Sequence, residues 1–405
     1  MKILFITDNF PPEINAPANR TFEHCQEWVK LGAEVTVITC FPNFPKGEVF
    51  EGYKNTWRKE ELICGIRVIR VWSYISANSG FVRRTLDYIS FGVSSFLHGL
   101  FIKSDIVIGT SPQFFSAMSA WQISLFTRRK WVMEVRDLWP ESIIAVGAIN
   151  NKRIISFLEW IEMKMYRSSN RIIVVTDAFK EIITSKGIDP NKIFIFKNGV
   201  DLSKYYPGPK SRDLVEELGL QGKMVFGYIG THGMAHGLDF ILDQVRKFNL
   251  SHKKDIHFLF LGDGASKAAL VEKATADKLK NVTFLDSVNK EEVLTYLQLM
   301  DIALVNLKKS DTFLSVIPSK IFEAAAVQKP ILLGLEGETK AIIDSYGAGL
   351  CFEPENSTDF IRKVLEFYEN RKNLEFYKIG CKKLAFDFER KKIAKSMLIV
   401  LKELV

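Results

Sequence analysis

Short, continuous apolar runs recur along the chain, and segments of helical length separate them. Unbroken rather than alternating hydrophobicity is typical of parallel strands that helices cover on both faces. The pattern therefore predicts a doubly wound α/β architecture. In the first half of the chain, the predicted strands are residues 3–7, 34–39, 67–71, 105–109, 131–135, 171–175 and 192–196.

A segment with closely spaced proline and glycine divides the chain. Residues 202–221, which include Pro207, Gly208 and Pro209, are predicted to form a linker. The apolar runs then restart, which predicts a second α/β domain of similar size. Its strands are expected at residues 224–229, 256–261, 282–285, 302–305, 331–334 and 349–352. Two domains are also the ordinary expectation for 405 residues.

Three segments depart from this alternation. Residues 41–60 contain two prolines and two glycines and are predicted to be irregular, and residues 388–404 are predicted to form an amphipathic final helix. Residues 81–103 are unusually apolar, but they are slightly short for a membrane-spanning helix and contain Asp87 and His98. Two interpretations stay open: a helix packed on the first sheet, or a helix in a membrane interface, helped by nearby arginines.

The net charge of +8 suits an anionic partner, which includes nucleic acid, an anionic membrane or a phosphorylated small molecule. Because the basic residues form no evident stripe, nucleic acid is the least favoured of the three. The five cysteines are scattered and form no C-x-x-C pair, which fits reduced thiols in a cytosolic protein. The N-terminus runs directly into a turn, so it is expected to be the first strand rather than a signal peptide.

We expect the chemistry at residues 315–326, between two predicted strands. Pro318 and Ser319 are predicted to open a helix, because proline suits the first turn. Free amides of that turn, the helix dipole and the Lys320 charge form an anion site. Glu323, one turn on, is placed to accept hydrogen bonds from the ribose of a bound nucleotide. The alternative is a helix start that binds only water, and the spacing alone does not exclude it.

Two glycine-containing turns follow predicted strands of the second domain. Residues 230–237 begin with Gly230, and Asp263 lies between two glycines. Glycine lets the backbone approach a phosphate or sugar closely, although an ordinary tight turn is the alternative. Neither residues 230–237 nor the opening turn of the first domain, residues 8–19, has the G-x-G-x-x-G spacing. A nicotinamide-dependent enzyme is therefore disfavoured.

Arg136 and Asp137 follow a predicted strand of the first domain. They are candidate site residues, because doubly wound sheets bind ligands at the carboxyl ends of their strands. An ion pair that stabilises the loop is the alternative. No Asp-x-Asp motif follows an interior strand and the histidines lack metal-ligand spacing, so no metal site is predicted.

Together these motifs resemble the retaining glycosyltransferases of family 4, which have the GT-B fold, and the resemblance spans essentially the whole chain. Asn-Gly-Val-Asp at residues 198–201 is similar to the end of the family's first domain. Gly-Asp-Gly at residues 262–264 is similar to its glycine turn, and Glu323 with Lys-Pro-Ile at residues 329–331 to the end of its two-glutamate motif. Residues 136–142 and 318–323 more narrowly resemble bacterial transferases of N-acetyl-L-fucosamine in surface-polysaccharide assembly.

The resemblance implies two Rossmann-like domains that face a central cleft. These would be an acceptor-binding domain at residues 1–203 and a nucleotide-sugar-binding domain at residues 204–385. Residues 386–405 would form a helix that returns to the first domain.

The resemblance also implies roles for single residues. The catalytic group would comprise Arg136 and Asp137, which face the donor sugar or acceptor, with Lys320 and Glu323. Glu323 would hold the ribose, and Val288 would lie against the base. The remaining donor contacts would come from Ala16, Gly230, Thr231, His236, Asp263, Ile317, Pro318 and Ser319.

The chain departs from the family pattern at three positions. Ser315 stands where the family has a glutamate that usually contacts the donor sugar. Thr231 and His236 stand where it has an arginine and a lysine. The diphosphate charge would then be met by Lys320, the backbone amides and His236. These departures affect the inferred donor sugar more than the inferred activity.

The implied reaction moves a sugar, N-acetyl-L-fucosamine or a related amino or deoxy sugar, from a UDP-sugar with retention and without metal or cofactor. The implied acceptor is a lipid-diphosphate-linked saccharide of capsule or O-antigen assembly. It would be met at the inner face of the cell membrane, with peripheral contact to anionic lipid. The rivals are a GT-B epimerase or phosphorylase, although no lysine marks a pyridoxal site, and a non-catalytic nucleotide-sugar-binding protein.

Overall fold

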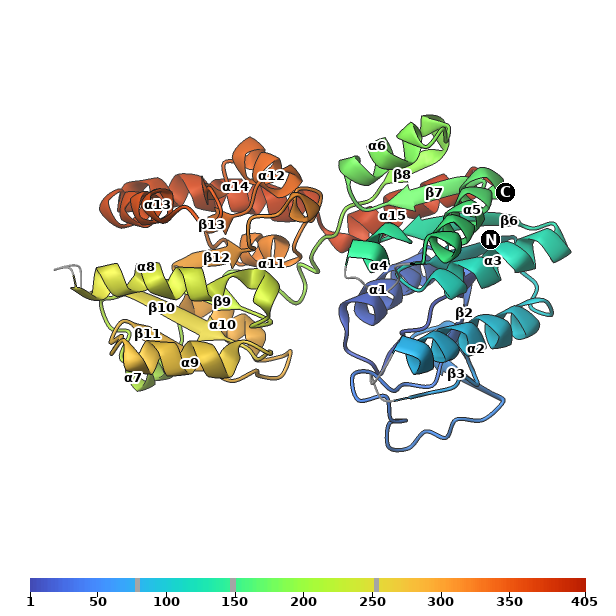
Figure 1. Cartoon of the computed structure of the whole chain (residues 1–405), viewed down its shortest axis with the longest axis horizontal. Coiled ribbons are helices and arrows are strands. Elements are labelled where there is room, and N and C mark those ends of the chain that lie inside the picture. Colours follow the sequence, from blue (N-terminus) through green and yellow to red (C-terminus); the bar gives the residue numbers. More distant parts are fainter. Residues whose placement is uncertain (77–80, 146–150, 251–254) are drawn as a thin grey trace. The chain divides into compact units, whose positions relative to one another are not determined.

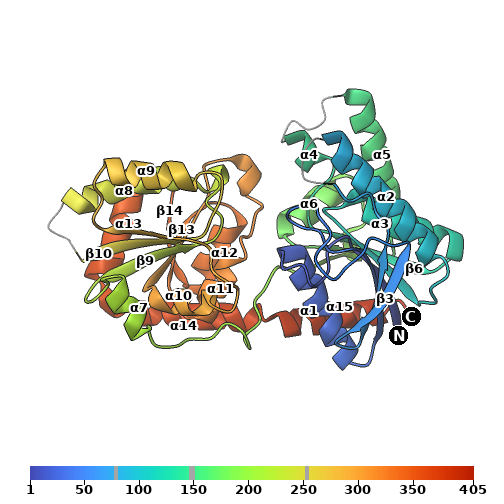
Figure 2. The same cartoon turned by 90° about the horizontal axis from the view of Figure 1, so that it is seen from below.

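A computed structural model describes residues 1–76, 81–145, 151–250 and 255–405. In these residues the chain forms two compact units, each built on its own sheet (Figures 1 and 2). Unit 1 comprises Met1–Lys197 and Arg390–Val405, and unit 2 comprises Asn198–Glu389. Unit 1 is therefore discontinuous in sequence, because the whole of unit 2 is inserted before its last helix.

Unit 1 contains an eight-stranded sheet in the order β3-β4-β2-β1-β5-β6-β7-β8. All neighbouring pairs are parallel except β3 with β4. The strands are β1 Lys2–Ile6, β2 Glu34–Cys40, β3 Arg58–Ile63, β4 Ile66–Val71, β5 Ile106–Thr110, β6 Lys130–Val135, β7 Arg171–Val174 and β8 Ile193–Ile195.

Helices cover both faces of this sheet. They are α1 Ala16–Lys30, α2 Phe81–Gly99, α3 Phe114–Thr127, α4 Glu141–Ala145, α5 Lys152–Ser168, α6 Asp177–Ser185 and α15 Arg390–Lys402, with a 3-10 turn at Pro190–Lys192. Helices α2, α3, α5 and α6 share one core with the sheet, and α1 and α15 share the other. The Trp28 indole of α1 donates a 2.9 Å hydrogen bond to the Ala394 carbonyl of α15. The expected return of the last helix to the first domain is thus confirmed.

Unit 2 contains six parallel strands in the order β11-β10-β9-β12-β13-β14, which is the order of a doubly wound nucleotide-binding sheet. The strands are β9 Met224–Ile229, β10 Ile256–Leu261, β11 Val282–Leu285, β12 Ile302–Asn306, β13 Ile331–Gly334 and β14 Gly349–Phe352. Successive side chains of β12 point to opposite faces, so Leu304 packs in the core under α8 and Val305 in the core under α11.

The helices of unit 2 are α7 Arg212–Glu217, α8 Leu238–Leu250, α9 Lys267–Ala276, α10 Val293–Leu299, α11 Lys320–Ala326, α12 Glu338–Tyr346, α13 Ser357–Glu369 and α14 Leu374–Asp387. Its 3-10 turns are Met234–His236, Asp311–Phe313 and Arg371–Asn373. None of the helices within the described ranges has the length and hydropathy needed to cross a membrane.

Three local predictions were wrong. Residues 58–60, expected to be irregular, begin strand β3, and the expected linker contains helix α7. Pro318 does not open α11, since Ser319 is the N-cap residue and Lys320 the first helical residue. The remaining strands lie within one or two residues of their predicted bounds.

Candidate functional site

The carboxyl ends of β9, β10 and β12 are adjacent in unit 2, because β9 pairs with both β10 and β12. Gly230 and Gly262 follow β9 and β10 and have φ angles of 136° and 143°. A Cβ atom at Gly262 would lie 2.0 Å from the Gly230 carbonyl oxygen. Glycine is therefore required here, and the backbone of both turns is left uncovered by side chains of their own.

Lys320 reaches across this edge of the sheet from the first turn of α11. Its Nζ donates a 2.6 Å hydrogen bond to the Tyr228 hydroxyl and lies 3.9 Å from the centre of the Tyr228 ring. Tyr228 in turn donates to the Thr231 carbonyl at 2.7 Å. A Cβ atom at Gly230 would lie 2.7 Å from Lys320 Nζ, so the absence of a side chain there makes room for the ammonium group.

Burial lowers the pKa of Lys320 from 10.5 to about 7, and the Glu323 carboxylate only partly offsets this effect. The neighbouring groups therefore balance the positive charge of Lys320 only in part. An anion beside Nζ would favour the protonated form and raise the pKa. Lys320 and Glu323 lie on the same short helix, as the sequence predicted, whereas Tyr228 was expected only as a residue of strand β9.

Two histidines line the turn that follows β9. His232 is fully buried, and neither ring nitrogen has a hydrogen-bond partner among the described residues. Burial, followed by the nearby Lys267 and Lys320, lowers its pKa. His236 is half-buried, and burial with the Lys320 charge lowers its pKa to about 4. Both rings are therefore neutral near pH 7.

The first residue of α9, Lys267, adds a second lysine to this edge. Lys267 Nζ donates to the Gly262 carbonyl at 2.9 Å and to the Leu285 carbonyl at 3.0 Å, and it pairs with Asp286. The exposed Asp263 accepts from the Gly264 amide at 2.7 Å. Val288, expected to lie against a nucleotide base, is half-buried two residues beyond Asp286.

The backbone at residues 317–320 differs from the expected helix start. The Ile321 amide donates to the Pro318 carbonyl at 3.3 Å, and the Phe322 amide donates to the Ser319 carbonyl at 3.0 Å. These two amides of the first turn are therefore already engaged. An anion-binding role for the backbone then falls to residues 317–320, of which Ile317 is buried and Pro318 has no N–H.

Arg136 and Asp137 lie at the end of β6 in unit 1. Arg136 Nη1 lies 3.5 Å from Glu134 Oε1, which also accepts a 3.2 Å hydrogen bond from Arg20 Nη1. Burial and the Arg20 charge lower the pKa of Arg136 to about 9, although Glu134 opposes them. The Ser111 hydroxyl accepts from both the Arg136 amide at 2.7 Å and the Asp137 amide at 3.2 Å, so this loop is anchored to the end of β5.

Neither Glu134 nor Arg20 was predicted as a site residue. Glu134 lies inside an apolar strand and Arg20 is distant in sequence, so only the folded chain brings them together. Ala16, the remaining candidate, is exposed at the start of α1 in unit 1. Among the described residues, no group of three or more histidine, cysteine, aspartate or glutamate side chains is arranged to hold a metal ion.

Two family models match the chain. Residues 15–199 match "Glycosyl transferase 4-like domain", and residues 211–381 match "Glycosyl transferases group 1". Together they cover most of both units.

Two curated relatives support the same assignment. The "Probable glycosyltransferase WbjE" of Pseudomonas aeruginosa is 27% identical over 59% of this chain, and the match spans 60% of that protein's length. The "Putative colanic acid biosynthesis glycosyl transferase WcaI" of Escherichia coli is 23% identical over 88% of this chain and 89% of its own.

Solved structures share the fold at low sequence identity. Sucrose-phosphate synthase of Thermosynechococcus elongatus superposes with a TM-score of 0.76, at 14% identity over 100% of this chain and 99% of its own. Anabaena HepE, solved in complex with UDP-glucose, superposes with a TM-score of 0.72, at 14% identity and with both chains fully covered.

Proposed function

The chain belongs to the group 1 glycosyltransferases and has their GT-B fold, and from this premise we propose that it transfers a sugar from a UDP-sugar with retention. The proposed acceptor is a lipid-linked saccharide of bacterial surface-polysaccharide assembly. The proposed donor sugar is N-acetyl-L-fucosamine or a related amino or deoxy sugar, the class to which the resemblance of residues 136–142 and 318–323 points. The names of WbjE and WcaI and the UDP-glucose bound to HepE support this proposal.

The position of Lys320 is the observation that carries the proposal. Its ammonium group lies against Gly230 at the carboxyl end of β9, where a doubly wound sheet binds a diphosphate. Burial has already removed water from this group, so it interacts strongly with a neighbouring anion. In our proposal, Lys320 and the backbone at residues 317–320 hold the diphosphate, and Glu323 holds the ribose.

Transfer breaks the bond between the donor sugar and the diphosphate, and negative charge grows on the leaving phosphate oxygen. A cation already in place stabilises that charge more in the transition state than in the ground state, which is how it raises the rate. The acceptor hydroxyl attacks on the face that the phosphate leaves, and the phosphate takes its proton. We therefore assign no protein nucleophile.

The test compares two half-buried lysines, Lys320 and Lys329. Lys320→Met should weaken UDP binding at least tenfold, measured by calorimetry, and should reduce transfer from a panel of UDP-sugars. Lys329→Met is the matched control, because burial also lowers the pKa of Lys329. Lys329 follows the carboxyl end of α11, away from Gly230, and donates to the Gln298 carbonyl. Equal UDP affinity in the two variants would show that Lys320 does not bind the diphosphate. Wild-type protein that binds no UDP would overturn the proposed donor.

A second candidate is a non-catalytic nucleotide-sugar-binding protein or an epimerase. The binding protein is favoured by Ser315, which stands in place of an expected glutamate. Product analysis separates these functions, since a transferase releases UDP only as an acceptor gains a sugar. An epimerase releases sugar without an acceptor, and a binding protein leaves the UDP-sugar intact.

A further inference from the structure

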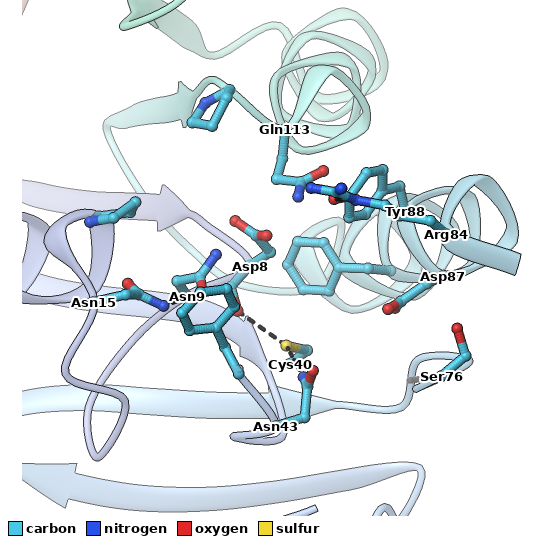
Figure 3. Close-up of a pocket in the computed structure, with 14 residues that line it drawn as sticks. Asp8, Asn9, Asn15, Cys40, Asn43, Ser76, Arg84, Asp87, Tyr88 and Gln113 are labelled. Atoms are coloured by element: carbon cyan, nitrogen blue, oxygen red, sulfur yellow. Dashed lines mark hydrogen bonds between the residues drawn. The ribbon is translucent and has the colours of Figure 1, made fainter. Parts of the chain in front are cut away.

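A separate pocket of about 210 Å³ lies in unit 1, where the chain leaves β1, β2 and β5 (Figure 3). This is smaller than the 300–1,000 Å³ that is usual for a drug-sized ligand, so it suits a single ring. Its polar lining comes from separate elements: Asp8 follows β1, Asp87 belongs to α2, and Gln113 precedes α3. In Figure 3, the Asp8 and Gln113 side chains extend toward the same space.

Some polar groups of the pocket are already used to hold its walls. Asn15 accepts from the Ala18 amide at 2.9 Å and donates to Asn9 at 2.6 Å, and Asn43 donates to the Phe41 carbonyl at 2.9 Å. Gln113, by contrast, makes no capping hydrogen bond with its side chain, although it stands at the N-cap position of α3. The Gln113 side-chain amide therefore lines the pocket and does not cap α3.

The carboxyl groups make the pocket unfavourable for anions. Burial, with repulsion from Glu13 and Asp87, raises the pKa of Asp8 to about 7. Burial, with repulsion from Glu13, also raises the pKa of Asp87 to about 6, although Arg84 opposes the shift. Glu13 is itself buried, and its Oε2 has no hydrogen-bond partner among the described residues. Its Oε1 accepts hydrogen bonds from the Asn43 and Phe44 amides at 2.8 and 2.9 Å, and the Arg70 charge partly offsets that of the carboxylate. The ionised fraction of the Asp8 and Asp87 carboxyl groups would still repel a bound anion.

The remaining lining matches the two kinds of surface on a sugar ring. Carboxylates accept strong hydrogen bonds from hydroxyl groups, and an amide both donates and accepts. The rings of Phe44 and Tyr88 offer apolar surface for the C–H faces of a sugar, and the buried Phe91 ring lies behind them in the pocket wall.

We propose that this pocket binds one uncharged, hydroxyl-rich sugar ring through Asp8, Asp87 and Gln113, and that it excludes uronic acids and sugar phosphates. Only the identification of this ring as part of the acceptor rests on the proposed transferase function. The sugar specificity rests on the pocket alone.

The experiment uses the full chain and three methyl glycosides: a neutral hexose, its N-acetylated 2-amino derivative and the corresponding uronic acid. Saturation-transfer NMR reports which of them bind. We expect signal from at least one neutral glycoside and none from the uronate. Asp8→Asn and Asp87→Asn should each reduce the neutral signal several-fold, whereas Glu181→Gln, on the exposed surface of α6, should not change it.

The double variant Asp8→Asn/Asp87→Asn distinguishes a specific loss of sugar binding from a loss caused by misfolding. Because Arg84 would then be the only charged side chain among the described residues that line the pocket, this variant should gain signal from the uronate. No signal from any neutral glycoside, or an unchanged pattern in the double variant, would overturn the proposal.

UDP titrated into the same samples tests the donor site separately. Sugar binding without UDP binding would overturn the proposed UDP-sugar donor but leave the pocket's specificity standing. UDP binding without sugar binding would overturn the pocket and leave the donor site standing.

Discussion

At the scale of single residues, the candidate donor site depends on the positive charge of Lys320, which burial in the folded chain makes less favourable. Lys320 has lost water, and its hydrogen-bond partner Tyr228 is a neutral hydroxyl group. Its folded-state pKa of about 7 lies below the ordinary 10.5, so the folded chain binds fewer protons than the unfolded chain between these values. The stability cost of burying this lysine is therefore largest below pH 7, and it falls as the pH rises from 7 toward 10.5.

UDP binding should consequently take up a proton. At pH 8, Lys320 is mostly neutral before UDP binds, and the negative charge of the diphosphate should favour its protonated form. Calorimetry at pH 8 in buffers of different ionisation enthalpy should reveal uptake of up to about one proton, set by the shift of the Lys320 pKa across that pH. The uptake should disappear in Lys320→Met and remain in Lys329→Met, and its persistence in the first variant would assign the proton to another group.

Gly230 offers a second test at this scale. Alanine there would strain a backbone with φ of 136° and place Cβ 2.5 Å from Lys320 Cε. We expect Gly230→Ala to lose about 1–3 kcal/mol of stability and to weaken UDP binding at least tenfold. Gly219→Ala is the control, because φ is also positive but no atom lies within 4 Å of the added Cβ. It should lower the melting temperature without changing UDP affinity, and equal UDP affinities in the two variants would contradict this account.

At the scale of elements, α15 completes the second core of unit 1. Leu398 is 2% exposed and packs with the α1 side of the sheet, whereas the adjacent Ile399 is 54% exposed. Leu398→Ala should cost about 2–5 kcal/mol in denaturant unfolding, because it leaves a cavity in a closed core. Ile399→Ala should cost less than about 1 kcal/mol. Similar losses from the two substitutions would show that α15 does not pack as described.

Helix α2 carries an exposed apolar stripe, formed by Leu86, Ile89, Val93 and Leu97. We propose that this stripe and the nearby arginines dock the chain on anionic lipid, one of the two interpretations of residues 81–103. The full chain should float with vesicles that contain phosphatidylserine at low salt, and Val93→Asp should reduce flotation several-fold. Asp substitution at the equally exposed Leu125 of α3 is the control. Absence from the lipid fraction at low salt would refute the docking surface.

At the scale of the whole molecule, the sequence predicted both sheets because their strands are continuously apolar. Strand β3 was missed because it is a charged edge strand, Arg-Lys-Glu-Glu-Leu-Ile, which pairs antiparallel and stays largely exposed. The candidate residues near α11 were accessible to sequence reasoning because they are close in sequence. The Lys320–Tyr228 and Arg20–Glu134 contacts were not, since they join residues 92 and 114 positions apart.

The discontinuity of unit 1 has a consequence during synthesis. Residues 390–405, which cover Trp28 and its neighbours, leave the ribosome only after the whole of unit 2. Until residues 390–405 emerge, the side of the unit 1 sheet that α1 shares with α15 is incompletely covered. We therefore expect the nascent first half of the chain to expose apolar surface that favours aggregation until the last helix packs.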